Sequence, residues 1–127
     1  MPNSQQSAHD RGVLGEELAC EYLAKKGYSI IERNYRIRGG EIDIITRDGK
    51  DIVFVEVKLR NSTRFGYPEE SVSYTKKKRV ARVIKSFLHS TGARYSCVRF
   101  DIIAIVQDVS GTKMNHIEDV ELPANIC

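Results

Sequence analysis

The chain has 127 residues, a formal net charge of +3 and 41% hydrophobic residues. This length fits one domain, and the apolar content is that of a protein with a packed core rather than of a disordered chain. The longest uncharged, apolar-rich run, residues 102–107, is far shorter than the roughly 20 residues that span a bilayer, and residues 1–10 do not resemble a signal peptide. We therefore expect one domain over residues 9–127 behind a flexible terminus over residues 1–8, in the cytoplasm and away from membranes.

The small net charge conceals an uneven distribution of charged residues. Residues 76–99 contain eight basic residues and no acidic residue, whereas residues 100–127 contain five acidic residues and one lysine. Such asymmetry indicates a nucleic acid or another anionic surface as a partner, although a run of like charge is more often a solvated helix face. Charge alone leaves both interpretations open.

Cysteine and histidine give no sign of a metal site or of a disulfide framework. The three cysteines are odd in number, and none lies near another cysteine or a histidine at the spacing of metal ligands. We therefore expect reduced cysteines. The three scattered histidines, His9, His89 and His116, are expected at the surface.

The first predicted element is a helix over residues 10–26, which ends at Gly27 because glycine accepts the left-handed conformation beyond a helix terminus. Apolar residues between Leu14 and Leu23 form one stripe of this helix. Glu17 projects from the opposite side, whereas Glu16 lies at the edge of the stripe. Glu16 is therefore the acidic residue of this helix that could face inward.

Three strands are predicted next. Residues 28–38 form the first, with an irregular continuation that ends at a Gly-Gly pair. Residues 41–47 and 52–60 form a hairpin, because the Asp-Gly step between them is typical of tight turns. We expect Glu41 and Asp43 to share one face of their strand, with Ile42 and Ile44 on the other.

The second hairpin strand also alternates. Its four residues Val53, Val55, Val57 and Leu59 are predicted to face the core, and the residues between them to form a face free for chemistry. A four-residue turn would place Asp43 opposite Glu56, and a two-residue turn would leave Glu56 diagonal to it on the same face. Both registers bring Asp43, Glu56 and Lys58 together, whereas a three-residue turn would not.

The rest of the chain predicts a loop, a helix and two strands. Residues 61–73 form a mobile loop, and a helix begins at Thr75 as the N-cap and extends to Gly92. A strongly apolar strand follows over residues 95–106, and residues 114–122 add an edge strand.

Two carboxylates and a lysine on one face of a sheet suit metal-assisted hydrolysis of a phosphodiester. Carboxylate oxygens hold Mg²⁺, the ion activates water and stabilises developing charge, and an ammonium group can orient that water or offset the charge of the phosphate. The same three residue types also form ordinary cross-strand ion pairs on a solvated face.

Several segments together resemble the YraN-like family of small, uncharacterised bacterial proteins. The resemblance covers residues 10–106 and is carried by residues 15–19, 22–23, 27–28, 33–36, 40–43, 54–60 and 99–101. That family is regarded as a distant relative of the archaeal Holliday junction resolvases, in the restriction endonuclease-like PD-(D/E)xK superfamily. The resemblance implies an α/β fold, with a restriction endonuclease-like core of α-β-β-β-α-β order around a central mixed sheet, and Mg²⁺-dependent cleavage of DNA.

Positions in the motif imply the residues of the site. Asp43 matches the aspartate of the motif, Glu56 its second acid and Lys58 its lysine. Glu16 matches the helix glutamate that completes the metal site of the resolvases. The implied catalytic residues are these four, and the implied ligands of Mg²⁺, for which Mn²⁺ is a substitute, are Asp43, Glu56, Glu16 and the carbonyl of Val57.

Basic side chains near this site are expected to contact DNA phosphates. They are Arg60, Arg64, Lys76, Lys77, Lys78, Arg79 and Arg82. No interleaving of aromatic and basic residues specifies bases, so we expect binding by shape or charge.

The sequence thus predicts a Mg²⁺-dependent endonuclease that hydrolyses DNA phosphodiester bonds, in branched or in recombination and repair intermediates. A non-catalytic nucleic-acid-binding protein on the same scaffold and a protein-interaction module are the alternatives. Because resolvases of this fold cut four-way junctions as dimers, a homodimer is one expected arrangement, although no self-complementary apolar surface is evident in the sequence.

Overall fold

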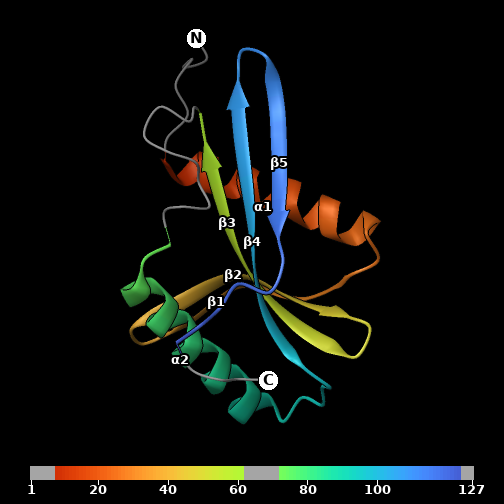
Figure 1. The fold of residues 1–127 in the computed structure, drawn as a ribbon, viewed down its shortest axis with the longest axis vertical. Helices are drawn as coiled ribbons and strands as arrows, with labels where there is room; N and C mark the ends of the chain where they lie inside the picture. The colour runs from red at the N-terminus through yellow and green to blue at the C-terminus, as the bar shows by residue number, and fades with distance from the viewer. Residues whose placement is uncertain (1–7, 62–71, 124–127) are drawn as a thin grey trace.

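The computed structural model describes residues 8–61 and 72–123. Over these two ranges the chain forms two helices and five strands (Figure 1). The elements in chain order are α1 (Ala8–Lys25), β1 (Ser29–Ile37), β2 (Gly40–Asp48), β3 (Asp51–Arg60), α2 (Tyr74–Thr91), β4 (Val98–Asp108) and β5 (Gly111–Ile117). The predicted α-β-β-β-α-β order is present, and β5 follows it.

The five strands form one mixed sheet in the order β1-β2-β3-β4-β5. Neighbouring strands are antiparallel except for β3 and β4, which are parallel. Parallel strands require a crossover connection, and α2 supplies it between β3 and β4. This arrangement is the restriction endonuclease-like core that the sequence predicted.

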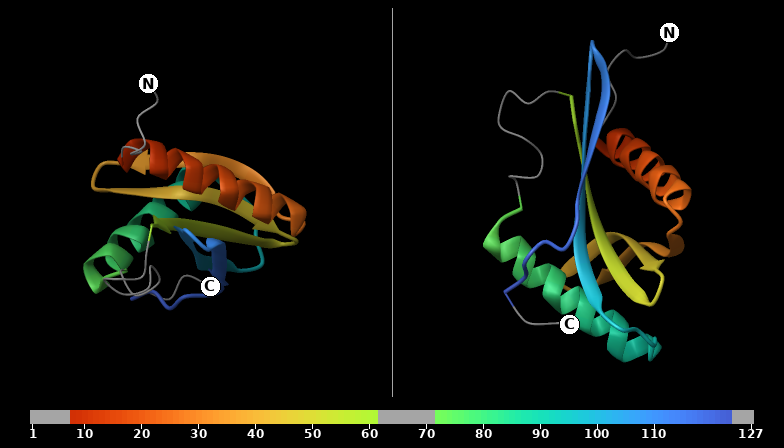
Figure 2. Two further views of the ribbon diagram at one scale, coloured as in Figure 1. Left: turned by 90° about the horizontal axis from the view of Figure 1, so that it is seen from above. Right: turned by 45° about the vertical axis from the view of Figure 1, so that its right-hand side comes forward.

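The two helices cover opposite faces of the sheet (Figure 2). Under α1, Ala19 and Leu23 pack in a buried cluster with Ile44, Val53 and Ile103. Under α2, the buried cluster contains Ile42, Phe54, Val83, Phe87 and Phe100. The prediction that one face of β3 packs in the core is confirmed at Val53, Val55 and Leu59. The prediction that the other face is free is wrong at Phe54, which is buried beneath α2.

The turn between β2 and β3 sets the register of the candidate site. Arg47 pairs with Ile52 and Asp48 with Asp51, which is one of the two predicted registers, the one that continues to Asp43 opposite Glu56. The backbone pairing itself ends at Ile44 and Val55, whereas β1 and β2 remain paired as far as Ile37 and Gly40. Strand β2 therefore leaves β3 at Asp43, and in Figure 1 the later half of β3 extends away from β1 and β2.

The separation of β2 from β3 changes which face its side chains occupy. Ile42 packs in the cluster beneath α2, whereas Ile44 packs in the cluster beneath α1. The prediction that these two isoleucines share a face is wrong, and the change of face falls where the pairing of β2 with β3 ends. The start of β2 lies close to α2: a Cβ atom at Gly40 would lie 2.8 Å from the Val83 side chain.

Several element boundaries differ from the predictions. Ser73, rather than Thr75, caps α2, because its side chain accepts a hydrogen bond from the Lys76 backbone N–H at 3.1 Å. Gly92 ends the helix at a φ of 62°, as predicted. The last strand covers residues 111–117 instead of 114–122. The predicted loop over residues 61–73 and the flexible residues 1–8 lie mostly outside the described residues, although Ala8 already belongs to α1.

The structure also bears on the expectations about membranes and about reduced cysteines. Neither helix of the described chain is long and apolar enough to cross a membrane. Cys20 is a free cysteine, but Cys97 is disulfide-bonded, so the expectation of reduced cysteines is wrong at Cys97. Spacing along the chain could not show this, because the fold decides which distant cysteines meet.

Candidate active site

Asp43 lies at the point where β2 separates from β3. Its Oδ2 atom accepts a hydrogen bond from the Val57 backbone N–H at 2.8 Å. On its other side, Val57 pairs with Ile103 of β4. The carboxylate of Asp43 therefore takes the place of a strand backbone as the acceptor for an N–H group that would otherwise be unsatisfied.

Glu56 is nearly buried, at 5% exposed, on the same side of the sheet as α2. Its Oε1 atom lies 3.3 Å from the Lys76 ammonium and 3.6 Å from the Lys58 ammonium. Its Oε2 atom is buried and has no hydrogen-bond partner among the described residues. A buried carboxylate oxygen without a partner is costly, so this is a position where a bound cation would be stabilised.

The electrostatics of Asp43 lead to the same conclusion. Burial, followed by the negative charge of Glu56, raises the pKa of Asp43 to about 7, although the hydrogen bond from Val57 opposes the shift. Lys76 also lowers this pKa, but not enough to restore the ordinary value. The surroundings of Asp43 thus disfavour its negative charge, and a divalent cation between the two carboxylates would stabilise it.

Glu16 approaches the site from α1. Its side chain is 13% exposed, compared with 57% for Glu17, which confirms that Glu16 lies at the inner edge of the helix. Its charge contributes to the raised pKa of Asp43. Its Oε2 atom accepts a hydrogen bond from the Asn34 side chain at 3.0 Å and lies 3.6 Å from the Arg33 guanidinium.

Asn34 is a residue of this site that the sequence analysis did not single out. It lies in β1 between residues paired with Ile44 and Ile42, and therefore opposite Asp43. Its φ of 54° is a left-handed conformation that costs energy for most residues but that asparagine tolerates. The only available signal was its place in the motif at residues 33–36, since the alternation of a strand gives no reason to expect such a backbone.

A cleft of about 410 Å³ lies between the β1–β2 turn and α2, and Lys76, whose ammonium contacts Glu56, is one of the residues that line it. The cleft is lined by Arg36, Ile37, Gly39, Gly40, Glu41, Lys76 and Arg79. Three of these residues are basic and one is acidic, and the acid, Glu41, already pairs with Arg36 at 3.0 Å. The lining suits an anion such as a phosphate group.

The basic residues predicted to contact DNA are in different environments. Lys76 is directed to Glu56, and Arg79 lines the cleft. The Lys78 ammonium lies 5.7 Å from the centre of the Tyr74 ring. Arg82 is exposed on α2.

Two further basic candidates, Lys77 and Arg60, are not among the described residues that line the cleft. Lys77 is partly exposed on α2, and Arg60 is exposed at the end of β3, where its guanidinium donates to the Leu59 carbonyl at 2.9 Å. Arg64 lies outside the described residues. The structure therefore brings together Lys76 and Arg79, and adds Arg36, which the sequence analysis had not selected.

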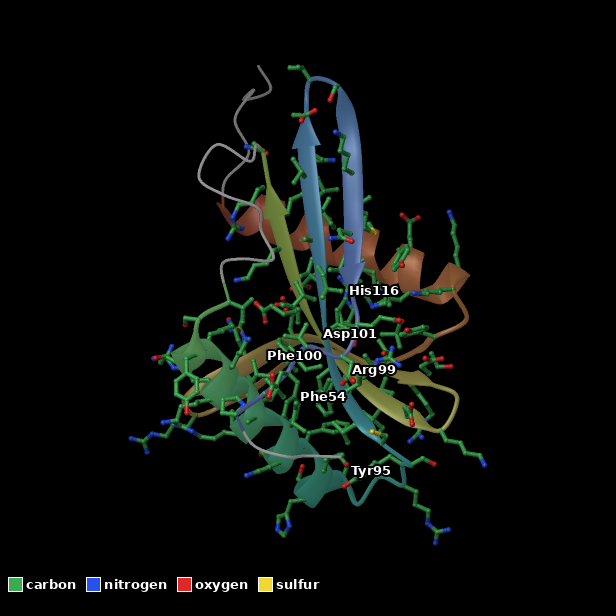
Figure 3. All side chains as sticks on the ribbon, viewed as in Figure 1. Phe54, Tyr95, Arg99, Phe100, Asp101 and His116 are labelled. Carbon is green, nitrogen blue, oxygen red and sulfur yellow. The ribbon has the colours of Figure 1, made fainter. Side chains whose placement is uncertain are left out.

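A second group of charged side chains, labelled in Figure 3 at Arg99, Asp101 and His116, lies on the α1 side of the sheet, where His116 contacts Tyr22 of α1. Asp101 is fully buried and accepts two hydrogen bonds of 3.0 Å from Arg99. It also accepts a hydrogen bond from the Asp119 backbone N–H at 3.0 Å and lies 2.7 Å from His116 Nε2. The His116 side chain is only 4% exposed, so the expectation of a surface histidine is wrong.

Asp101, His116 and Glu118 offer ligand atoms within 4.8 Å of one another, a spacing that could hold a metal ion. However, Arg99 contacts both oxygens of Asp101 and lies 3.5 Å from Glu118. Burial alone would raise the pKa of Asp101, but hydrogen bonds from His116, Arg99 and Asp119 lower it overall. A cation would have to displace a guanidinium here, whereas Glu56 presents an unpaired oxygen.

The fold is that of a mixed α/β protein with a restriction endonuclease-like core, and it brings Asp43, Glu56 and Lys58 together where β2 leaves β3. The chain belongs to the uncharacterised protein family UPF0102, whose model matches residues 15–105. This membership confirms the resemblance to the YraN-like family.

Relatives match over most of their length. The UPF0102 protein of Caldicellulosiruptor saccharolyticus is 42% identical over 114 residues, which cover 90% of this chain and 93% of the relative. That of Syntrophomonas wolfei is 45% identical over 106 residues, covering 84% and 92%. That of Chlorobium limicola is 50% identical over 100 residues, covering 79% and 78%. The names of these relatives state no activity, so a function must be argued from the site.

Proposed function

We propose that this protein is a metal-dependent endonuclease that hydrolyses phosphodiester bonds in DNA. The observation that carries the proposal is the buried, unpartnered Oε2 atom of Glu56, across the hairpin from a second carboxylate, Asp43. A salt bridge on a solvated face would not leave such an atom. The PD-(D/E)xK motif assigns the same two residues to metal binding.

The donor atoms fit Mg²⁺, which prefers oxygen ligands. Asp43 and Glu56 would hold the ion, with the Val57 carbonyl and Glu16 as further oxygen donors. When bound, Mg²⁺ or Mn²⁺ lowers the pKa of water and offsets charge on the phosphate. Glu16 is oriented for this role by Asn34 and Arg33, because both hold the same carboxylate oxygen.

The basic residues would act on the substrate. The Lys58 ammonium lies 3.6 Å from Glu56 Oε1, and its side chain is 18% exposed, so it can orient a water molecule or contact the scissile phosphate while it remains at the site. Arg36 and Arg79 line the adjoining cleft, where they would bind a flanking phosphate. These contacts address the DNA backbone, so selection among substrates would depend on shape.

We propose branched or flapped DNA as the substrate class, by analogy with the resolvases, and hence the cytoplasm as the compartment. A homodimer would supply the paired cuts that a four-way junction needs. These parts of the proposal rest on the superfamily rather than on the carboxylates.

Cleavage of end-labelled four-way, flapped, single-stranded and duplex DNA in Mg²⁺ or Mn²⁺ tests the proposal. We expect cutting of at least one substrate, and a loss of about 10³-fold in rate for Glu56→Gln, because the ion's several kcal/mol of charge stabilisation would be lost. Glu32→Gln removes an exposed acid of β1 and serves as the control. The proposal would be contradicted if no substrate were cut in a metal-dependent way, or if such cutting survived Glu56→Gln.

The basic cleft also supports a second candidate, a DNA-binding protein without catalysis. It predicts salt-sensitive binding that Arg79→Ala and Arg82→Ala weaken but that Asp43→Asn and metal ions leave unchanged. The absence of DNA affinity even at low salt would instead favour a protein-interaction module.

A further inference from the structure

We propose that Lys76 competes with the metal ion for Glu56: its ammonium neutralises Glu56 in the metal-free protein and moves to a DNA phosphate in the adjoining cleft when a divalent cation binds. The inference rests on the proposed function, since it assumes that Glu56 is a metal ligand. It assigns to Lys76 a regulatory role that the motif does not contain.

The first support is the position of two ammonium groups on one carboxylate oxygen. Lys58 follows Glu56 by two residues on β3, so the strand itself places it at the site. Lys76 comes from the first turn of α2 and reaches Glu56 Oε1 at 3.3 Å, closer than the 3.6 Å of Lys58. One lysine would satisfy the motif, and the second contact is the shorter of the two.

The second support is the unpartnered Oε2 atom of the same carboxylate. Two ammonium groups share Oε1, and neither reaches Oε2 within hydrogen-bond distance. A divalent cation held through Oε2 would come close to the ammonium of Lys76, and like charges at this separation repel strongly in a poorly solvated site. Lys76 would then be driven from the carboxylate.

The third support is that Lys76 has a second place to go. Its side chain also lines the cleft that contains Arg36 and Arg79, so the same ammonium can face a phosphate bound there. The backbone of Lys76 stays fixed meanwhile, because its N–H donates to the Ser73 cap at 3.1 Å. Only side-chain rotation is required, since 29% of the side chain is exposed.

The movement would couple metal binding to DNA binding. A cation at Glu56 frees Lys76 for a phosphate, and by thermodynamic reciprocity a phosphate that captures Lys76 strengthens cation binding by the same factor. The metal-free protein would bind DNA less tightly than the metal-bound protein does. The DNA-free protein would likewise bind the metal ion less tightly than the DNA-bound protein does.

Titration of Mn²⁺ into the full chain without DNA, followed by the electron paramagnetic resonance of free Mn²⁺, tests the competition directly. Lys76→Gln removes the competing charge, so we expect it to bind Mn²⁺ about tenfold more tightly than the wild type. Lys85→Gln removes one exposed positive charge from the same helix and should bind Mn²⁺ within about twofold of the wild type.

A second measurement follows DNA affinity by fluorescence anisotropy, with and without Ca²⁺ as a cation for binding without cleavage. The wild type should gain affinity with Ca²⁺, and Lys76→Gln should show a smaller gain than Lys85→Gln. Circular dichroism checks that each variant is folded.

The outcomes separate the two proposals. If Lys76→Gln leaves Mn²⁺ affinity unchanged or weakens it, while Glu56→Gln abolishes binding, Lys76 is not a competitor and the metal site stands. If neither the wild type nor Lys76→Gln binds Mn²⁺, both the competition and the proposed function are overturned.

Discussion

The Asp101 group and the Asp43–Glu56 site both bury carboxylates in the same sheet, but they satisfy them differently. Asp101 has a guanidinium, a histidine and a backbone N–H on its two oxygens. Glu56 has two ammonium groups on one oxygen and none on the other. Both oxygens of the Asp101 carboxylate therefore have partners within the folded chain, whereas Oε2 of Glu56 has none among the described residues.

The pKa shifts of the two aspartates express this difference. Hydrogen bonds outweigh burial at Asp101 and lower its pKa, whereas burial and the nearby Glu56 raise the pKa of Asp43. Folding therefore favours the charged form of Asp101 and disfavours that of Asp43. The Asp101 group has ligand atoms at the spacing of a metal site, but its carboxylate oxygens already have partners. The Asp43–Glu56 site is the better candidate because it contains a buried oxygen without a partner among the described residues.

The largest effect expected from this comparison is the loss of stability in Asp101→Ala. Arg99 and His116 would lose their buried partner, so we expect the free energy of unfolding to fall by about 3–5 kcal/mol. Urea denaturation followed by circular dichroism measures it. A loss below about 1 kcal/mol would show that the group does not stabilise the fold.

Metal-dependent stabilisation distinguishes the two groups directly. At a Mn²⁺ concentration of 100 times the dissociation constant, we expect the wild type to gain about 2.7 kcal/mol in the free energy of unfolding. Glu56→Gln should abolish the gain, and His116→Gln should keep it. The reverse result would move the metal to the Asp101 group.

A smaller effect of opposite sign is expected for Asp43→Asn in the metal-free protein. The substitution removes a buried charge that Glu56 repels, while an amide oxygen can still accept the Val57 hydrogen bond. We expect the protein to gain about 1–2 kcal/mol of stability at pH 8 in chelator. Equal or lower stability would mean that the charge of Asp43 is better compensated than its surroundings indicate.

The smallest effect is expected in the acid dependence of stability. Because the folded protein lowers the pKa of Asp101, its contribution is complete above the ordinary aspartate pKa near 4 and is lost as pH falls through the lowered value. Urea midpoints between pH 5 and pH 2.5 should therefore fall less steeply in Asp101→Asn than in the wild type. The difference is at most about 1.4 kcal/mol per pH unit, since one proton is involved.

Much of the fold could be predicted because its signals are local. The Asp-Gly turn predicted the hairpin and two registers, one of which places Asp43 opposite Glu56, and helical periodicity separated Glu16 from Glu17. The shared face of Asp43 and Glu56 could be predicted because a hairpin has few registers and both of the favoured ones place these residues on the same face, whereas the choice between the two was left to the structure.

Contacts between distant elements could not be derived in the same way. His116 meets Asp101 only through the register of β4 and β5, and Lys76 meets Glu56 only because α2 crosses the sheet at that point. Phe54 is buried because helices cover both faces, whereas strand alternation predicted one free face. Each of these contacts depends on tertiary packing, which composition and periodicity do not encode.

The departure of β2 from β3 at Asp43 has a mechanical consequence. Asp43 and Glu56 come from two strands whose backbones pair with each other only up to Ile44 and Val55. A cation held by both Asp43 and Glu56 would link β2 to β3 beyond that point, where their backbones are not paired. The Val57 amide, held there by a single side-chain hydrogen bond, would then exchange its hydrogen with solvent more slowly in the metal-bound protein than in the free protein.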